Sequence, residues 1–143
     1  MSGIDPSKAD ATEFNDIEVY AKNLSLETII DWLNDTFDSV VTVNSDKLVH
    51  DMDVTRQGKR IPVIIVESVV GEAWASIWVK SIGTPWMDDL QCARSLHSYG
   101  QCKVRCNSGP WQEGADMDKW WQLDEHGQEE LIQWPTKESL INS

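Results

Sequence analysis

Thiol and imidazole side chains are the first candidates for chemistry, because they bind metals and act as nucleophiles and bases. Cys102 and Cys106 lie four residues apart in a segment where apolar and charged residues alternate. On a strand this spacing separates the two Cα atoms by about 13 Å, which is too far for one ion. Cys92 and His97 are five residues apart on a predicted helix and point in different directions. We therefore expect no metal site and three reduced, partly buried cysteines.

Catalytic patterns are absent from the sequence. The chain contains no nucleophile elbow, zinc-protease motif or phosphate-binding loop. His50 lies on the apolar side of a predicted strand, where a hydrogen-bonded core histidine is commoner than a catalytic one. Asp88 and Asp89 are adjacent, so on a helix they diverge by about 100° and do not form an acid–base pair. The sequence predicts no catalytic residue and no cofactor.

The most informative constellation combines tryptophans with cations. Trp74, Trp78 and Lys80 recur at every second position or a multiple of it, so on a strand they share one face. Lys103 and Arg105 have the same spacing in the next predicted strand. Tryptophan and arginine are enriched where binding energy concentrates, so these five residues form the predicted binding surface.

Three interpretations of that surface stay open. The rings are core residues covered by another element, or they form an interface with a protein partner or a second copy of the chain, or they stack nucleic-acid bases. The formal net charge of −12 opposes the last interpretation, because nucleic-acid and anionic-membrane binding rest on cationic side chains. We expect a protein-interaction or binding module, with a homodimer or another protein as partner.

An alternative function is a small-molecule-binding domain or small enzyme with a tryptophan-lined pocket. A tryptophan-rich loop between the last strands could close over the second predicted helix, bringing aromatic and polar groups together. The candidate pocket residues are Trp86, Arg94, His97, Trp111 and Gln112.

Charge is distributed unevenly along the chain. Residues 1–53 carry a net −9, residues 54–107 a net +3 and residues 108–143 a net −6. Three acids lie four residues apart on one face of the first predicted helix: Glu27, Asp31 and Asp35. A solvated helix face explains them most simply, and an acidic nucleic-acid mimic is a further alternative function.

Periodicity predicts the elements that must position these side chains. Helical spacing of apolar residues begins after Ser25, a good N-cap, and reaches Val40. A second helix is predicted from the N-cap Thr84 to Tyr99, with Gly100 as its C-cap. Strands are predicted at 48–55, 61–70, 73–80 and 102–106, a link at 41–46, and a terminal hairpin at 119–124 and 129–134.

These elements predict an α+β two-layer sandwich with a mostly antiparallel sheet and two main helices. The strands on either side of the second helix are predicted to form one parallel βαβ pair. The strand at 61–70 is almost continuously apolar, which predicts cover on both of its faces.

The predicted organisation is a flexible acidic leader at 1–23 with a short ordered piece around 14–20, one domain at 24–135 and a polar tail at 136–143. The N-terminus lacks the pattern of a secretory signal and no apolar run is long enough to span a membrane, so we expect a cytoplasmic protein. The element order over roughly residues 25–125, with small size and high acidity, is similar to bacterial type III secretion chaperones and related dimeric α+β domains. No motif accompanies that similarity, and no function is transferred from it.

Overall fold

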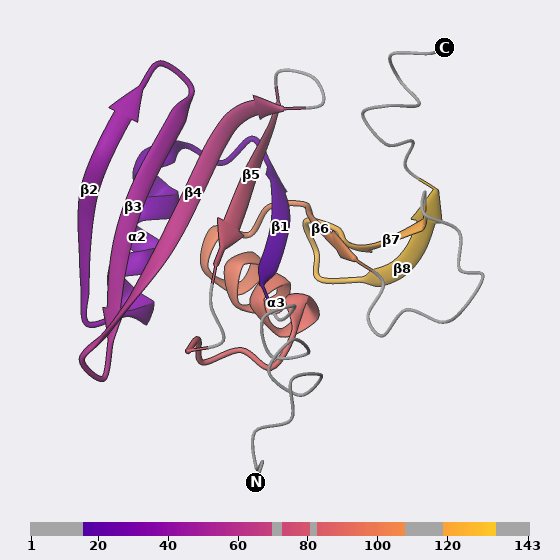
Figure 1. Cartoon of the computed structure of the whole chain (residues 1–143). Coiled ribbons are helices and arrows are strands. Elements are labelled where there is room, and N and C mark those ends of the chain that lie inside the picture. The colour runs from indigo at the N-terminus through magenta and orange to yellow at the C-terminus, as the bar shows by residue number, and fades with distance from the viewer. Residues whose placement is uncertain (1–15, 70–72, 81–82, 108–118, 134–143) are drawn as a thin grey trace, which may run out of the picture.

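The computed structural model describes residues 16–69, 73–80, 83–107 and 119–133. Within them, eight strands form one antiparallel sheet in the order β2-β3-β4-β5-β1-β6-β7-β8, accompanied by two helices (Figure 1). The helices are α2 (Leu26–Thr36) and α3 (Asp89–Gly100). The strands are β1 (Ile17–Lys22), β2 (Ser39–Asp46), β3 (Val49–Arg56), β4 (Lys59–Val69), β5 (Trp74–Val79), β6 (Val104–Asn107), β7 (Lys119–Leu123) and β8 (Glu129–Gln133). The predicted α+β class is confirmed.

Period-two alternation determines which side of each strand faces the helices. In β1, Ile17, Val19 and Ala21 are buried, while the residues between them are only partly buried. Their register partners on β5 are Val79, Ile77 and Ala75, which are buried on the same side. Further buried residues on this side of the sheet are Met52, Val54, Ile61, Val63, Ile65, Val104, Cys106 and Leu123. Apolar burial on this one side is the main stabilising contribution to the fold.

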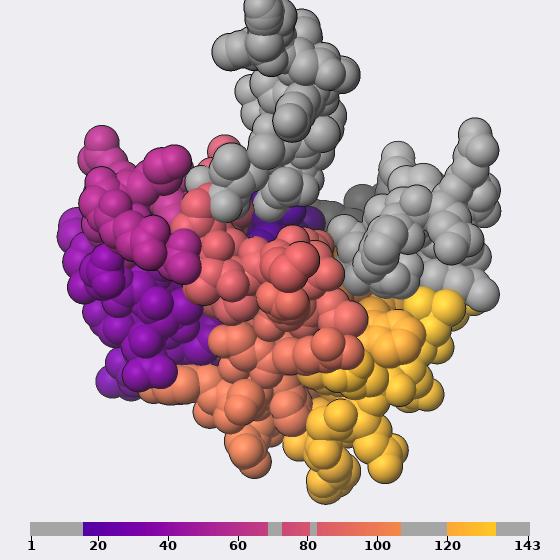
Figure 2. Space-filling model, turned by 90° about the horizontal axis from the view of Figure 1, so that it is seen from below, coloured from indigo at the N-terminus to yellow at the C-terminus, as the bar shows by residue number. Residues whose placement is uncertain are grey.

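The two helices pack against this side and against each other. Ile29, Trp32 and Leu33 of α2 are almost fully buried, and Cys92, Ala93 and Leu96 of α3 are fully buried. The Trp32 indole Nε1 donates a hydrogen bond of 3.1 Å to Ser95 Oγ on α3. Figure 2 shows the α3 segment between the part of the molecule formed by α2 to β3 and the part formed by β7 and β8.

The predicted parallel pair is wrong. β5 and β6, the strands on either side of α3, are not neighbours, because β1 lies between them and pairs antiparallel with both. Two strands that are each antiparallel to the same neighbour run in the same direction. β5 and β6 therefore point the same way, as in a βαβ unit, but β1 lies between them and they form no parallel pair. Sequence order alone cannot reveal a strand inserted from another part of the chain.

The inserted strand comes from the segment assigned to the flexible leader at 1–23. Within that segment, Ile17–Lys22 is a central strand of the sheet, paired along its whole length with β5. Only three of its six residues face the helices, and one of them is the small Ala21. So short an alternation gives a weak sequence signal.

Helix boundaries differ from the prediction at three ends. Ser25 is the N-cap of α2 as predicted, and its side chain accepts a hydrogen bond from Thr28 N–H. The helix ends at Thr36, however, and the predicted link at 41–46 belongs to strand β2. α3 begins after its N-cap Asp88, whose side chain accepts a hydrogen bond from Gln91 N–H, and its left-handed C-cap is Gln101 rather than the predicted Gly100.

Thr84, predicted as the N-cap of this helix, instead forms a local turn in which its hydroxyl accepts a hydrogen bond from Trp86 N–H. Threonine and aspartate compete for the same capping role, and both stand before an apolar helical run here.

β4 is covered on one face only. Ile61, Val63 and Ile65 are fully buried against the helices, whereas Pro62 is exposed and Ile64 is half-buried. The prediction that this strand is covered on both faces is therefore wrong for these residues. The apolar residues on its other side belong to a surface that the helices leave uncovered.

Candidate binding surface

The side of the sheet opposite α2 and α3, here called the far face, carries the predicted tryptophans and cations. Trp74, Ser76 and Trp78 alternate with the helix-facing Ala75, Ile77 and Val79 along β5. The register of β1 places Lys22, Tyr20 and Glu18 beside Trp74, Ser76 and Trp78 in that order. Period-two geometry on two paired strands thus gathers these side chains on one side.

Trp78 is the exposed aromatic centre of the far face. Its exposed fraction is 38%, although its two neighbours in sequence, Ile77 and Val79, are fully buried. The Lys80 Nζ lies 4.7 Å from the centroid of the Trp78 ring, a cation–π contact. A tryptophan is among the side chains that contribute most binding free energy at protein interfaces.

Apolar side chains of the neighbouring strands extend the surface around Trp78. Ile64 on β4 is its direct register partner, and Val66 lies two residues further along the same strand. Val49 on β3 pairs with Val66, and it is 44% exposed. The far face between β3 and β5 thus presents a connected apolar surface, here called the Trp78 patch: Val49, Pro62, Ile64, Val66 and Trp78.

Charged residues of both signs border the Trp78 patch. Asp51 and Asp53 lie on β3 beside Ile64 and Pro62. Arg60, at the start of β4, approaches Asp53 with Nη1 3.4 Å from Oδ2. On the β5 side of the patch, Lys80 lies over the ring of Trp78. An apolar centre with a charged border is the usual anatomy of a protein interface.

Trp74 has a different environment from Trp78. It is 8% exposed, and the Arg105 guanidinium carbon lies 4.5 Å above its ring centroid. Arg105 Nε also donates a hydrogen bond of 2.8 Å to Gln122 Oε1 on β7. Partial burial lowers the pKa of Arg105 from its usual value. The contact therefore spans β5, β1 and β6, and it ties the two halves of the sheet together on the far face.

Tyr20 fills the space between these strands. Its hydroxyl donates a hydrogen bond of 3.1 Å to Glu18 Oε2, and its ring meets Trp120 edge-on with centroids 5.5 Å apart. Burial and the neighbouring Glu18 carboxylate raise the pKa of the Tyr20 phenol. The sequence predicts only a short ordered piece around residues 14–20 of the leader, and it does not predict that Glu18 and Tyr20 lie on a strand of the sheet.

The structure therefore separates the five predicted binding residues into three environments. Trp78 and Lys80 form an exposed pair, and Trp74 and Arg105 form a stacked, largely buried pair. Lys103 precedes β6 and is half-buried, with its carbonyl accepting a hydrogen bond from Lys22 N–H at the end of β1. Their role in binding stays a prediction.

Of the predicted pocket residues, the described ones are engaged elsewhere. Trp86 stacks on Trp32 with ring centroids 5.3 Å apart, inside the helix layer. Arg94 forms an ion pair with Glu129 at 2.9 Å, and His97 Nε2 lies 3.3 Å from the Glu125 carbonyl oxygen. These contacts hold α3 to the β7–β8 hairpin. Trp111 and Gln112 lie outside the described residues.

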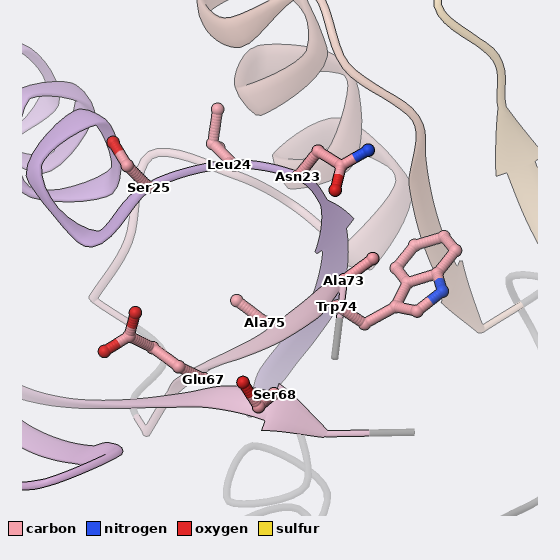
Figure 3. A pocket seen from close by; sticks show the side chains of 8 residues that line it. All are labelled: Asn23, Leu24, Ser25, Glu67, Ser68, Ala73, Trp74 and Ala75. Atoms are coloured by element: carbon pink, nitrogen blue, oxygen red, sulfur yellow. The ribbon is translucent and has the colours of Figure 1, made fainter. Parts of the chain in front are cut away.

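A cavity of about 290 Å³ lies elsewhere, where β1 turns into α2 beside the ends of β4 and β5 (Figure 3). Its lining combines small, apolar and polar side chains: Asn23, Leu24, Ser25, Glu67, Ser68, Ala73, Trp74 and Ala75. The Trp74 indole points away from the centre of this cavity in Figure 3. Asn23 and Ser68 both have left-handed backbones, which bend the chain at this end of the sheet.

Two further observations concern the described residues alone. They contain no group of three or more histidine, cysteine, aspartate or glutamate side chains arranged to hold a metal ion. None of their helices has the length and apolar character needed to cross a bilayer.

Comparison with known proteins gives no relative. No family model, curated protein or solved structure matches the chain.

Proposed function

We propose that the chain is a protein-interaction module that binds its partner through the Trp78 patch. The observation that carries the proposal is the exposure of Trp78, a large aromatic ring beside Ile64 on β4, from which the apolar surface continues through Val66 to Val49 on β3. Isolated exposed apolar residues are normal, whereas a contiguous patch with a charged border is typical of an interaction site.

We take a second copy of the chain as the partner, because the far face carries charges of both signs. Acids on β3 (Asp51 and Asp53) and cations at Arg60 and Lys80 lie on the same face. In a two-fold pairing of identical faces, the acidic row of one copy can lie over the basic residues of the other.

The alternatives have less support. The described cavity is at the lower limit of the roughly 300–1,000 Å³ typical of ligand pockets, and Trp86, Arg94 and His97, the predicted pocket residues that the structure describes, do not line it. Glu27, Asp31 and Asp35 are exposed on α2, on the opposite side of the sheet from the Trp78 patch. A nucleic-acid mimic would bind through that helix. The two proposed functions therefore use different surfaces and can be tested independently.

Sedimentation equilibrium of the wild type and two variants tests the proposal. We expect a dimer for the wild type and a folded monomer for Trp78→Glu. Dimerisation would bury the new carboxylate in the centre of the patch without a cation or hydrogen-bond donor to compensate for its lost hydration. Met87→Glu is the matched control, since Met87 is 82% exposed and lies outside the far face. It should leave the dimer intact.

A wild type that is monomeric at the highest soluble concentration overturns the homodimer. A dimer that survives Trp78→Glu shows that another surface mediates association. Thermal unfolding of each variant distinguishes loss of association from loss of folding.

A further inference from the structure

Three polar side chains on neighbouring strands form a hydrogen-bonded row on the helix-facing side of the sheet. Ser45 on β2 and His50 on β3 are direct register partners, and Ser45 Oγ lies 2.5 Å from His50 Nδ1. The other ring nitrogen, His50 Nε2, lies 2.8 Å from Glu67 Oε2 on β4. A serine, a histidine and a carboxylate are thus joined in series by both nitrogens of one imidazole.

The carboxylate determines which nitrogen of the neutral imidazole carries the proton. Glu67 accepts hydrogen bonds and donates none when ionised, so His50 must present Nε2–H to it. The lone pair of Nδ1 then faces Ser45 Oγ, and it accepts the serine hydroxyl proton. This is the arrangement of an activated serine nucleophile, with the two ring nitrogens in exchanged positions relative to chymotrypsin-type triads.

Burial and exposure are distributed as this chemistry requires. His50 is 5% exposed, which protects the two hydrogen bonds from competing water. Ser45 is exposed, and among the described strands β2 pairs only with β3, so its outer edge is accessible from solvent. An edge strand also presents backbone N–H groups, the kind of donor that stabilises an oxyanion.

We propose that Ser45 is a nucleophile for acyl transfer from small activated esters, with His50 as its general base and Glu67 as the residue that positions His50. Ser45 Oγ attacks the ester carbonyl carbon while its proton passes to His50 Nδ1. As the C–O bond to the leaving group breaks, His50 returns that proton to the leaving oxygen. Water then attacks the acyl-serine by the same route, releasing a carboxylic acid and restoring Ser45 Oγ–H.

This proposal is independent of the Trp78 patch, which lies on the opposite side of the sheet. The sequence predicts no site here, since Ser45 lies in the predicted link at 41–46 and His50 is predicted as a hydrogen-bonded core residue. Its partners become visible only when β2, β3 and β4 are paired in register.

A fluorophosphonate probe tests the nucleophile directly, because a serine Oγ–P bond forms as the P–F bond breaks and fluoride leaves. We expect mass spectrometry to locate the label on Ser45 of the wild type, and Ser45→Ala to be unlabelled. His50→Gln should reduce the labelling rate about 100-fold or more, the usual contribution of a general base. Ser39→Ala is the matched control, because Ser39 is an exposed serine on the same strand. Its labelling should equal that of the wild type.

A second measurement addresses the positioning role of Glu67. With p-nitrophenyl acetate as the substrate, Glu67→Gln should lower kcat at least about tenfold and leave KM unchanged, since the carboxylate stabilises the imidazolium and does not touch the substrate. Circular dichroism checks that each variant is folded. A wild type whose Ser45 is not labelled, or a folded His50→Gln labelled at the wild-type rate, overturns the proposal.

Discussion

At the scale of single residues, the three thiols show how burial removes reactivity. Cys92, Cys102 and Cys106 are all free and buried. Desolvation by burial raises the pKa of Cys102 to about 11 and that of Cys106 to about 12, and it raises the pKa of Cys92 well above its usual value. The thiolate is the reactive form, so these side chains are inert at neutral pH.

The prediction at this scale concerns alkylation. In the native protein, iodoacetamide at mildly alkaline pH should leave all three cysteines unmodified over a time in which a free thiol reacts completely. In denaturant all three should react, because unfolding restores the ordinary thiol pKa. Rapid native modification of Cys92 or Cys106, each fully buried, would contradict the described packing.

At the scale of elements, one carboxylate connects α3 to the terminal hairpin. Glu129 on β8 accepts hydrogen bonds from Arg94 Nε and Nη2 of α3, each at 2.9 Å, and from Trp121 Nε1 at 2.9 Å. The Arg94 hydrogen bond is the main reason that the pKa of Glu129 lies below its usual value of 4.5. A carboxyl group whose pKa is lowered by folding stabilises the folded state above the unfolded pKa.

Glu129→Gln should therefore lower the stability at neutral pH, by less than about 1 kcal/mol because the Arg94 side chain is largely exposed to solvent. The difference from the wild type should shrink as the pH falls from about 4.5, the unfolded pKa, through the lower pKa of the folded state, where the wild-type carboxylate also loses its charge. Urea unfolding at a series of pH values measures it. Glu130→Gln, an exposed neighbour on β8, is the control, and an equal effect there would refute the specific role of Glu129.

Local periodicity predicted those elements whose pattern agrees with their packing. The N-cap Ser25, the alternation of His50, Met52 and Val54, and the terminal hairpin all have the predicted positions. β2 was missed because Val40 continues the helical spacing, although the chain is already extended there. Val40 is compatible with both helical and strand periodicity, so the sequence pattern alone cannot assign it to a helix or a strand.

The candidate surface was predictable to the same extent. Alternation alone placed Trp74 and Trp78 on one face of β5, and the structure has them there. The sequence does not predict which ring is exposed, because the contact between Trp74 and Arg105 joins residues two strands apart in the sheet. The serine–histidine–glutamate row needs the register of three strands, which is likewise a tertiary property.

At the scale of the whole molecule, β1 joins two parts of the sheet that are otherwise separate. It pairs with β5 on one side and with β6 on the other, so β2–β5 and β6–β8 are continuous only through it. On the far face, the Arg105–Trp74 contact spans the same junction. We therefore expect the two parts to unfold as one cooperative unit rather than as separate halves.

Val19, fully buried in the middle of β1, allows this expectation to be tested. Val19→Ala removes two methyl groups from the core and should cost about 2 kcal/mol. Under native conditions, hydrogen exchange followed by mass spectrometry should show amides of β4 and β6 losing protection by the same factor, since both exchange through global unfolding. If only β6 loses protection, the C-terminal part of the sheet unfolds on its own. That outcome would contradict the expectation that β1 joins both parts into one cooperative unit.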